Sequence, residues 1–122
     1  MKTKCLDTYA LIEIHDDNPN FINYLNEDFV IIDLIMAEFY GIMLRNYNEQ
    51  TAQYLFKKFE AYLKPVDVKI LIKAVKFRQE NKKENLSFFD CVGYVYALEN
   101  NMNFVTGDKE FKNKEGVMFI QK

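Results

Sequence analysis

Short apolar runs alternate with longer, helix-like patterns of apolar residues along this chain. Four of the runs predict strands, at 2–6, 29–32, 104–106 and 117–120. Apolar residues at helical spacing predict helices over 8–14, 33–46, 52–63, 67–80 and 87–100, with a shorter helix after Asn18 and Pro19. Strands separated by helices favour parallel pairing with helices on both faces. The predicted fold class is therefore α/β, with three α/β/α layers around a mainly parallel sheet of four to five strands.

Residues at the ends of these segments fit the same scheme. Asp33 is placed to cap the helix at 33–46, and Ser87 is placed to cap the helix at 87–100. Pro65 is expected to stop the helix at 52–63, and the polar stretch 81–85 is expected to form a loop. Because the chain has 122 residues and no internal repeat, we expect one domain over residues 1–122.

Composition narrows the possible partners and the compartment. The net charge is −2, so no overall positive field attracts nucleic acid, and any such contact must be local or metal-mediated. Cys5 and Cys91 lie in apolar segments without paired metal-ligand spacing, which favours buried, reduced thiols and a cytoplasmic protein. Asp7 and Glu13 interrupt what would be the apolar core of a signal peptide, and no stretch reaches the roughly 18 to 20 apolar residues of a membrane span. We therefore expect no membrane partner.

Four acidic residues lie in or beside apolar runs, where a carboxylate is costly. Asp7 follows the strand at 2–6, and Asp108 follows the strand at 104–106 after a single glycine. Glu38 and Asp90 lie in the first turn or two of the helices that begin near residues 33 and 87. A carboxylate among apolar neighbours needs a basic partner, backbone donors or a metal ion to replace its hydration. A divalent cation is the leading interpretation.

The predicted topology brings these four acids to one place. In an open parallel sheet, the ends of strands and the starts of the following helices share the carboxyl edge, where ligands bind. We therefore expect the four carboxylates to converge on one pocket. Like charges this close cannot all remain ionised in a low-dielectric site unless cations enter. Mg²⁺ or Mn²⁺ is the expected partner, because these ions prefer oxygen ligands.

Each acid also has a purely structural interpretation. Asp7 and Asp108 could each cap the helical turn that follows, and Asp90, three residues after Ser87, could complete a capping box. Glu38, inside a helix among apolar residues, would need an ion-pair partner from elsewhere in the chain. We favour one shared cation site over four separate roles.

Four short motifs carry a family resemblance. They are Leu6-Asp7-Thr8, Ala37-Glu38-Phe39 with Gly41, Leu86-Ser87-Phe88-Phe89-Asp90 followed by Tyr96-Ala97, and Val105-Thr106-Gly107-Asp108 followed by Phe111. With the acids in this order over essentially the whole chain, the sequence resembles a PIN domain and is similar to the VapC-type toxins. Gly107 departs from relatives that have a polar or basic residue there, which affects a possible substrate contact rather than the metal site.

The resemblance implies a metal-dependent nuclease that acts on RNA. In this interpretation, Asp7, Glu38, Asp90 and Asp108 match the acidic quartet that holds one or two Mg²⁺ or Mn²⁺ ions, with Asp7 and Asp108 as the first choices for direct ligands. A bound metal lowers the pKa of a coordinated water and neutralises charge on the phosphate. Thr8 and Thr106 match positions where the family often has hydroxyls that orient a ligand or phosphate, although threonine is also common at strand ends.

Partners are less clearly indicated. Lys109, Lys112 and Lys114 follow Asp108 and could contact an RNA backbone, whereas the lysines at 69, 73 and 76 share a helical face that could equally be solvated. Abundant apolar residues in the first half of the chain suit a homodimer. The resemblance also implies a small antitoxin protein as a partner if the chain is a toxin, while RNA processing stays open as another role.

Two other functions fit part of the pattern. A catalytically silent PIN-fold binding or scaffold module would keep the fold without cleavage, but the presence of all four acids disfavours it. A receiver-like Mg²⁺-binding signalling domain would need adjacent acids after the first strand, whereas Asp7 stands alone there and Glu38 lies within a helix. The sequence therefore predicts a divalent-metal-dependent endoribonuclease.

Overall fold

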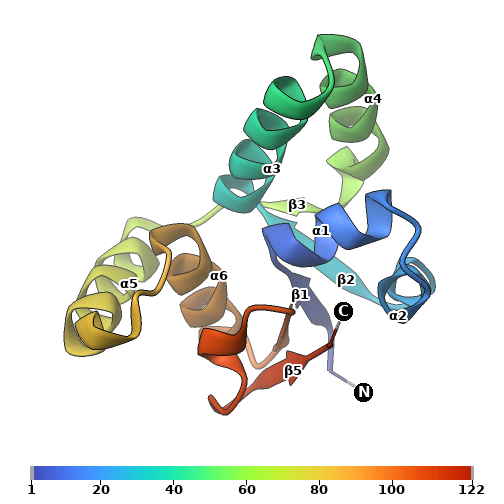
Figure 1. The fold of residues 1–122 in the computed structure, drawn as a ribbon. Coiled ribbons are helices and arrows are strands. Elements are labelled where there is room, and N and C mark those ends of the chain that lie inside the picture. The colour runs from blue at the N-terminus through green and yellow to red at the C-terminus, as the bar shows by residue number, and fades with distance from the viewer. Residues whose placement is uncertain (1, 122) are drawn as a thin grey trace.

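The computed structural model describes residues 2–121, and its centre is a five-stranded sheet (Figure 1). The strands are β1 (Lys4–Leu6), β2 (Phe29–Ile32), β3 (Leu63–Lys64), β4 (Asn103–Thr106) and β5 (Val117–Phe119). They lie in the order β3-β2-β1-β4-β5, and every neighbouring pair is parallel. The predicted α/β class and parallel pairing are confirmed.

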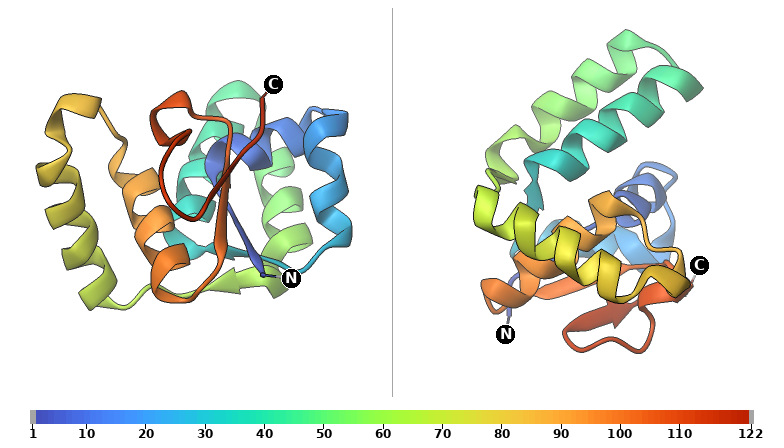
Figure 2. Two further views of the ribbon diagram at one scale, coloured as in Figure 1. Left: turned by 90° about the horizontal axis from the view of Figure 1, so that it is seen from below. Right: turned by 90° about the vertical axis from the view of Figure 1, so that its left-hand side faces the viewer.

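The connections between the strands are helical. The described residues form α1 (Thr8–His15), α2 (Pro19–Ile22), α3 (Asp33–Asn46), α4 (Glu49–Phe59), α5 (Val68–Glu80) and α6 (Phe88–Glu99), with 3-10 turns η1 (Asn23–Asn26), η2 (Glu60–Tyr62), η3 (Lys82–Glu84) and η4 (Lys109–Phe111). Helices α1 and α2 lie on one side of the sheet and α5 and α6 on the other, while α3 and α4 form a hairpin beyond the end of β2 (Figures 1 and 2). The helical layers are those expected of a three-layer fold.

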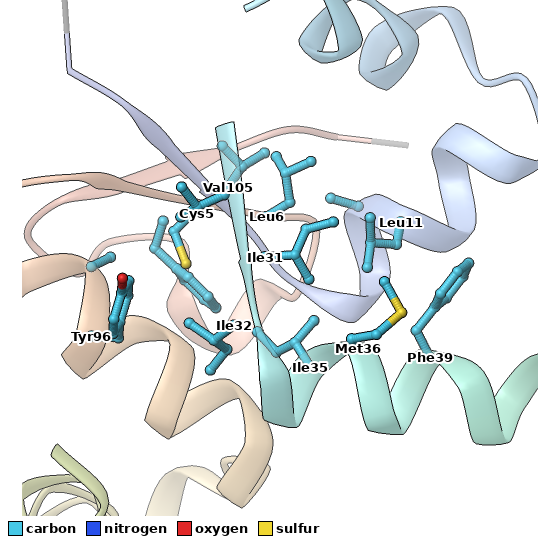
Figure 3. Close-up of a cluster of buried hydrophobic side chains, with 14 of the residues drawn as sticks. Cys5, Leu6, Leu11, Ile31, Ile32, Ile35, Met36, Phe39, Tyr96 and Val105 are labelled. Atoms are coloured by element: carbon cyan, nitrogen blue, oxygen red, sulfur yellow. The ribbon is translucent and has the colours of Figure 1, made fainter. Parts of the chain in front are cut away.

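Strand β2 is buried along its whole length, which is why it reads as a continuous apolar run. Successive side chains of a strand point to opposite faces. Ile31 accordingly points toward Leu11 of α1, whereas Ile32 points to the side on which Tyr96 of α6 lies (Figure 3). The alternation therefore supplies apolar contacts to both helical layers.

The prediction of a helix to residue 63 was wrong. Helix α4 ends at Phe59, and after one 3-10 turn Leu63 and Lys64 pair with β2 as the edge strand β3. Pro65 disfavours helical backbone at the residue before it, and β2 offers an unpaired edge to which an extended segment can hydrogen-bond. The apolar spacing at 52–59 is genuine, but Leu63 belongs to the sheet.

Asp33 does not cap α3 as predicted. Ile32 occupies the N-cap position, and Asp33 is the first helical residue. Its Oδ1 accepts a hydrogen bond from the Leu34 amide at 2.8 Å, and its Oδ2 accepts one from the Val66 amide at 3.4 Å. Asp33 therefore ties the start of α3 to the segment after β3, a long-range contact that local spacing does not encode.

Both cysteines are free and buried, as predicted. Burial raises the pKa of the Cys5 thiol far above its ordinary range and that of Cys91 to about 11. Both thiols are therefore held in the neutral form. Among the described residues, no helix is long and apolar enough to cross a membrane.

Candidate metal centre

Two of the four acids lie at the carboxyl ends of the two central strands. Asp7 follows β1 directly, and Asp108 lies two residues after β4, which is the parallel neighbour of β1. The connection from β1 leads to β2 on one side, whereas the chain later returns to β4 on the other side. This reversal is the topological switch point of an open parallel sheet, where ligands bind beyond the carboxyl ends of the strands.

Asp7 is fully buried and is only half satisfied by hydrogen bonds. It caps α1, and its Oδ1 accepts a hydrogen bond from the Ala10 amide at 2.7 Å. Its Oδ2 is buried without a hydrogen-bond partner in the part of the chain that the structure describes. Burial first, and then the nearby charge of Asp90, raises the pKa of Asp7 well above its usual range, against the opposing effects of the Thr106 hydroxyl and the Ala10 amide. The capping role predicted as an alternative is real, but it leaves one oxygen unexplained.

Asp90 lies in the first turn of α6 and faces the other acids. Its amide donates to the Ser87 hydroxyl at 3.3 Å, so Ser87 is the predicted cap of this helix. Burial, followed by the charges of Glu38 and Asp108, raises the pKa of Asp90 to about 7. This shift requires all three carboxyl groups to lie within electrostatic reach of one another, on three different elements.

Glu38 reaches the same region from the second turn of α3. Its Oε1 accepts a hydrogen bond from the Thr8 hydroxyl at the start of α1. Thr8 is itself buried and directly follows Asp7. The polar partner that the sequence could not supply for Glu38 is therefore a neutral hydroxyl next to Asp7, rather than a basic residue.

Asp108 is held by the turn that links β4 to η4. Its amide donates to the buried Thr106 hydroxyl at 2.9 Å, and its Oδ1 accepts from the Glu110 amide at 3.0 Å as the N-cap of η4. Thr106 therefore fixes the backbone from which the Asp108 carboxylate projects. Both threonines predicted near the site contact or orient one of its acids.

The four acids are not neutralised by basic side chains. Between residues 2 and 121, the ion pairs are Lys4 with Glu27, Lys73 with Glu99 and Lys114 with Glu84. In the same range, no three histidine, cysteine, aspartate or glutamate side chains stand close enough together to enclose an ion without moving. The arrangement is thus a self-repelling acidic cluster with a buried, unpartnered oxygen at its base.

The comparison with known protein families decides the family of this chain. The family model of the PIN domain matches residues 4–117, which include β1, β4 and all four acids. This chain belongs to the PIN domain family.

Solved structures share the fold of this PIN domain at low sequence identity. VapC20 of Mycobacterium tuberculosis, described as a sarcin-ricin loop cleaving toxin, has a TM-score of 0.80 at 11% identity, with 93% of this chain and 96% of that one covered. A DNA-bound VapBC complex from Salmonella typhimurium gives 0.76 at 16% identity, with 98% and 97% covered. A toxin-antitoxin complex from Klebsiella pneumoniae gives 0.74 at 20% identity, with 94% and 95% covered. No curated protein matches the sequence.

The two lysines predicted to contact substrate lie on the surface of the PIN domain beyond Asp108. Lys109 is exposed in η4, and the Lys112 ammonium lies 5.5 Å from the centre of the Phe119 ring. Lys114, which the sequence grouped with these two lysines, is instead engaged: its ammonium pairs with Glu84 at 3.0 Å and lies 5.5 Å from the Phe77 ring centre. Of this basic segment, Lys109 is the residue nearest in sequence to the acids.

Proposed function

We propose that this PIN domain is a divalent-metal-dependent endoribonuclease, and that it is the toxin of a toxin-antitoxin pair. The observation that carries the proposal is the buried Asp7 Oδ2, which has no partner within residues 2–121, beside the charges of Asp90 and Asp108. A folded protein keeps such an uncompensated acid at a cost in stability, and a bound cation would offset that cost. The VapC structures support the choice of an RNA-cleaving toxin.

The residues present fit an oxygen-ligated divalent ion. Asp7 and Asp108 would be direct ligands, and Glu38 and Asp90 would ligate directly or through water, with Mg²⁺ or Mn²⁺ as the ion. When bound, such an ion lowers the pKa of a coordinated water and neutralises charge on the phosphate. Because the carboxylates do not yet enclose an ion, Glu38, Asp90 and Asp108, which are only partly buried, would rotate their side chains toward Asp7.

The remaining side chains orient these acids and the RNA. The Ala10 amide fixes Asp7, the Thr8 hydroxyl holds Glu38, and the Thr106 hydroxyl holds the backbone of Asp108. In the metal-free protein, burial and the charges of Glu38 and Asp108 raise the pKa of Asp90 to about 7, and a bound cation would favour its ionised, ligating form. The exposed Lys109 and Lys112 would contact the RNA backbone.

The direct test is cleavage of a mixed panel of RNAs by the purified protein with Mn²⁺ or Mg²⁺. We expect discrete fragments that disappear with a chelator and with Asp7→Asn, because that substitution keeps the cap of α1 but removes a metal-ligating charge. A matched control is Asp28→Asn, at an exposed aspartate just before β2. Cleavage that survives both the chelator and Asp7→Asn would reject the mechanism, and metal binding without any cleavage would favour the catalytically silent scaffold.

An apolar groove on the α3–α4 hairpin supports an antitoxin as a partner. A cavity of about 450 Å³ is lined by Met36, Ala37, Tyr40, Phe56 and Leu63, with Gln53 and Asp33 at its polar positions. Ala37 precedes Glu38, so a chain seated in this groove would approach the acidic cluster. We propose that an apolar antitoxin segment binds here, and Ala37→Arg should abolish complex formation in co-purification while leaving RNA cleavage intact.

A homodimer is proposed from a second apolar surface. Val68 and Ile72 lie one turn apart on α5 and are 63% and 50% exposed, while the opposite side of this helix packs on α6. Residues at i and i+4 lie on one helical face, and such a face is suited to a symmetric contact with its own copy. Ile72→Glu should convert a dimer to a monomer in analytical ultracentrifugation, and an unchanged sedimentation coefficient would argue against this surface.

A further inference from the structure

A cationic cavity lies where α5 passes through η3 into α6. Its volume is about 330 Å³, at the small end of the range for ligand pockets. Arg78 and Lys82 supply two cations, Gln79 and Asn85 supply two amides, and Val75, Leu86 and Phe88 supply apolar surface. None of the residues that line it is acidic. This chemistry differs from that of the apolar α3–α4 groove, which has no cation in its lining.

The cavity lies at the same edge of the molecule as the acidic cluster. Leu86 and Phe88 flank the cap of α6, and Asp90 lies in the first turn of the same helix, on another side of it from Phe88. Glu84, in the loop that carries Lys82 and Asn85, is joined to Lys114 of the segment after η4 by an ion pair of 3.0 Å. In the left view of Figure 2, the α5–α6 connection and the segment after β4 both lie toward the upper edge. A chain of nucleotides seated in the cavity could therefore continue around the start of α6 toward Asp90 and Asp108.

Two lining residues are already oriented for a ligand. The Arg78 Nε donates to the Leu86 carbonyl at 2.8 Å, the one hydrogen bond that the Arg78 side chain makes within residues 2–121. The other four N–H donors of the guanidinium therefore stay available for an anion. Asn85 has a φ of 54°, a left-handed conformation that asparagine tolerates better than most residues. The backbone of the cavity rim is thus fixed by Arg78 and Asn85.

We propose that this cavity binds one nucleotide of single-stranded RNA, next to the phosphate that the acidic cluster would process. The proposal rests on the ribonuclease function and names a substrate subsite for it. Leu86 and Phe88 would contact the base, Gln79 and Asn85 would hydrogen-bond to its edge, and Arg78 with Lys82 would pair with its phosphate. A mixture of cations, amides and apolar surface in a small cavity suits a nucleotide better than an apolar protein segment.

Two substitutions in the α5–α6 loop test separately what the Lys82 cation and the Asn85 amide contribute to RNA binding. Lys82→Gln removes a lining cation, and Asn85→Gly removes the amide while glycine keeps the left-handed backbone. Lys83→Gln is the matched control, because Lys83 is an exposed neighbour that does not line this cavity. All three are made in an Asp7→Asn background, so that the RNA stays intact, and thermal melts monitor the fold.

The measurement is the Kd of a fluorescently labelled single-stranded RNA at several salt concentrations. Lys82→Gln should reduce the slope of log Kd against log salt by about 0.7, which corresponds to roughly fourfold weaker binding near 0.15 M salt. Asn85→Gly should weaken binding without changing that slope, because it removes a neutral donor. Lys83→Gln should behave like the Asp7→Asn background.

Unchanged affinity and slope in both cavity variants would overturn the proposal. So would a changed sedimentation coefficient with unchanged RNA affinity, since the cavity would then be a contact between protein copies. Cleavage by the protein without substitutions is assayed separately. If it cleaves RNA while both cavity variants bind normally, only the subsite is rejected; if the variants lose RNA affinity but no cleavage occurs, only the nuclease proposal is rejected.

Discussion

The ring of Tyr9 fills the space that a side chain at residue 107 would need. A Cβ atom on Gly107 would lie 2.1 Å from Cε1 and 2.6 Å from Cζ of Tyr9. Tyr9 lies two residues after Asp7, and Gly107 directly precedes Asp108. The contact between them therefore joins the two segments that carry the acids at the centre of the sheet, and it explains why glycine stands at this position.

Gly107→Ala is expected to destabilise the protein by about 1–3 kcal/mol, as overpacking of a close contact does. Tyr9→Ala opens the space, so the double variant should lose less stability than the sum of the two single variants. Urea unfolding of all four proteins measures the coupling. Strict additivity would mean that the ring moves aside freely and that the contact does not position Asp108.

Asp7→Asn should stabilise the metal-free protein. The ionised Asp7 lacks hydration and the protonated form must take up a proton at neutral pH, so both forms of the buried acid cost more stability than an amide in the same place. Asparagine still caps α1 through its side-chain oxygen. A gain of about 1–3 kcal/mol corresponds to a Tm higher by roughly 4 to 12 °C for a domain of this size.

The same variant should lose the stabilisation that a metal gives. Mn²⁺ is expected to raise the Tm of the protein without substitutions and to leave that of Asp7→Asn nearly unchanged, because a ligand stabilises only the state that binds it. Asp28→Asn should respond to Mn²⁺ like the original sequence. A Tm that falls for Asp7→Asn in the presence of a chelator would show that this acid is structural.

The stability of the metal-free protein should fall as the pH rises from 5 to 8. Burial and the charges of Glu38 and Asp108 raise the pKa of Asp90 from 3.8 to about 7 in the folded state. Between these two pKa values, the folded protein holds a proton that the unfolded chain has released. The resulting stabilisation of the folded state is complete below pH 4 and is lost as the pH rises through 7. Asp90→Asn should flatten this decline in thermal melts with a chelator, although the raised pKa of Asp7 leaves part of it. An equal slope in both proteins would contradict the shift.

The fold was largely predictable because parallel strands and their helices carry strong local patterns. β2 is apolar at every position since both of its faces are covered, and the caps at Asp7 and Ser87 mark the starts of α1 and α6. β3 was missed because two residues carry no periodicity of their own and are defined by their pairing with β2. Pro65 signalled a stop but not a strand.

The sequence predicted which acids form the candidate site, but not the residues that they contact. Their positions after strands and at helix starts follow from topology, whereas their partners come from other elements. The hydrogen bond from Thr8 to Glu38 spans 30 residues, and the cavity at Arg78 and Lys82 depends on the packing of α5 against α6. The position of the cavity had one signal in the sequence: the loop before Ser87 leads into the helix that carries Asp90, so it must lie at the same edge of the sheet. Contacts between side chains distant in sequence leave no pattern in one chain.

Thr8→Val tests whether the hydroxyl positions Glu38 for the metal. Valine keeps the shape of threonine but cannot donate to the Glu38 carboxylate. Loss of a group that orients a metal ligand typically reduces metal affinity or activity 10- to 100-fold, so calorimetry should give a Kd for Mn²⁺ about tenfold weaker than that of the original protein. Thr8→Ser retains the hydroxyl and should restore the affinity. If Thr8→Val binds Mn²⁺ as tightly as the original protein, the hydroxyl does not position Glu38, and Glu38 is oriented by α3 alone.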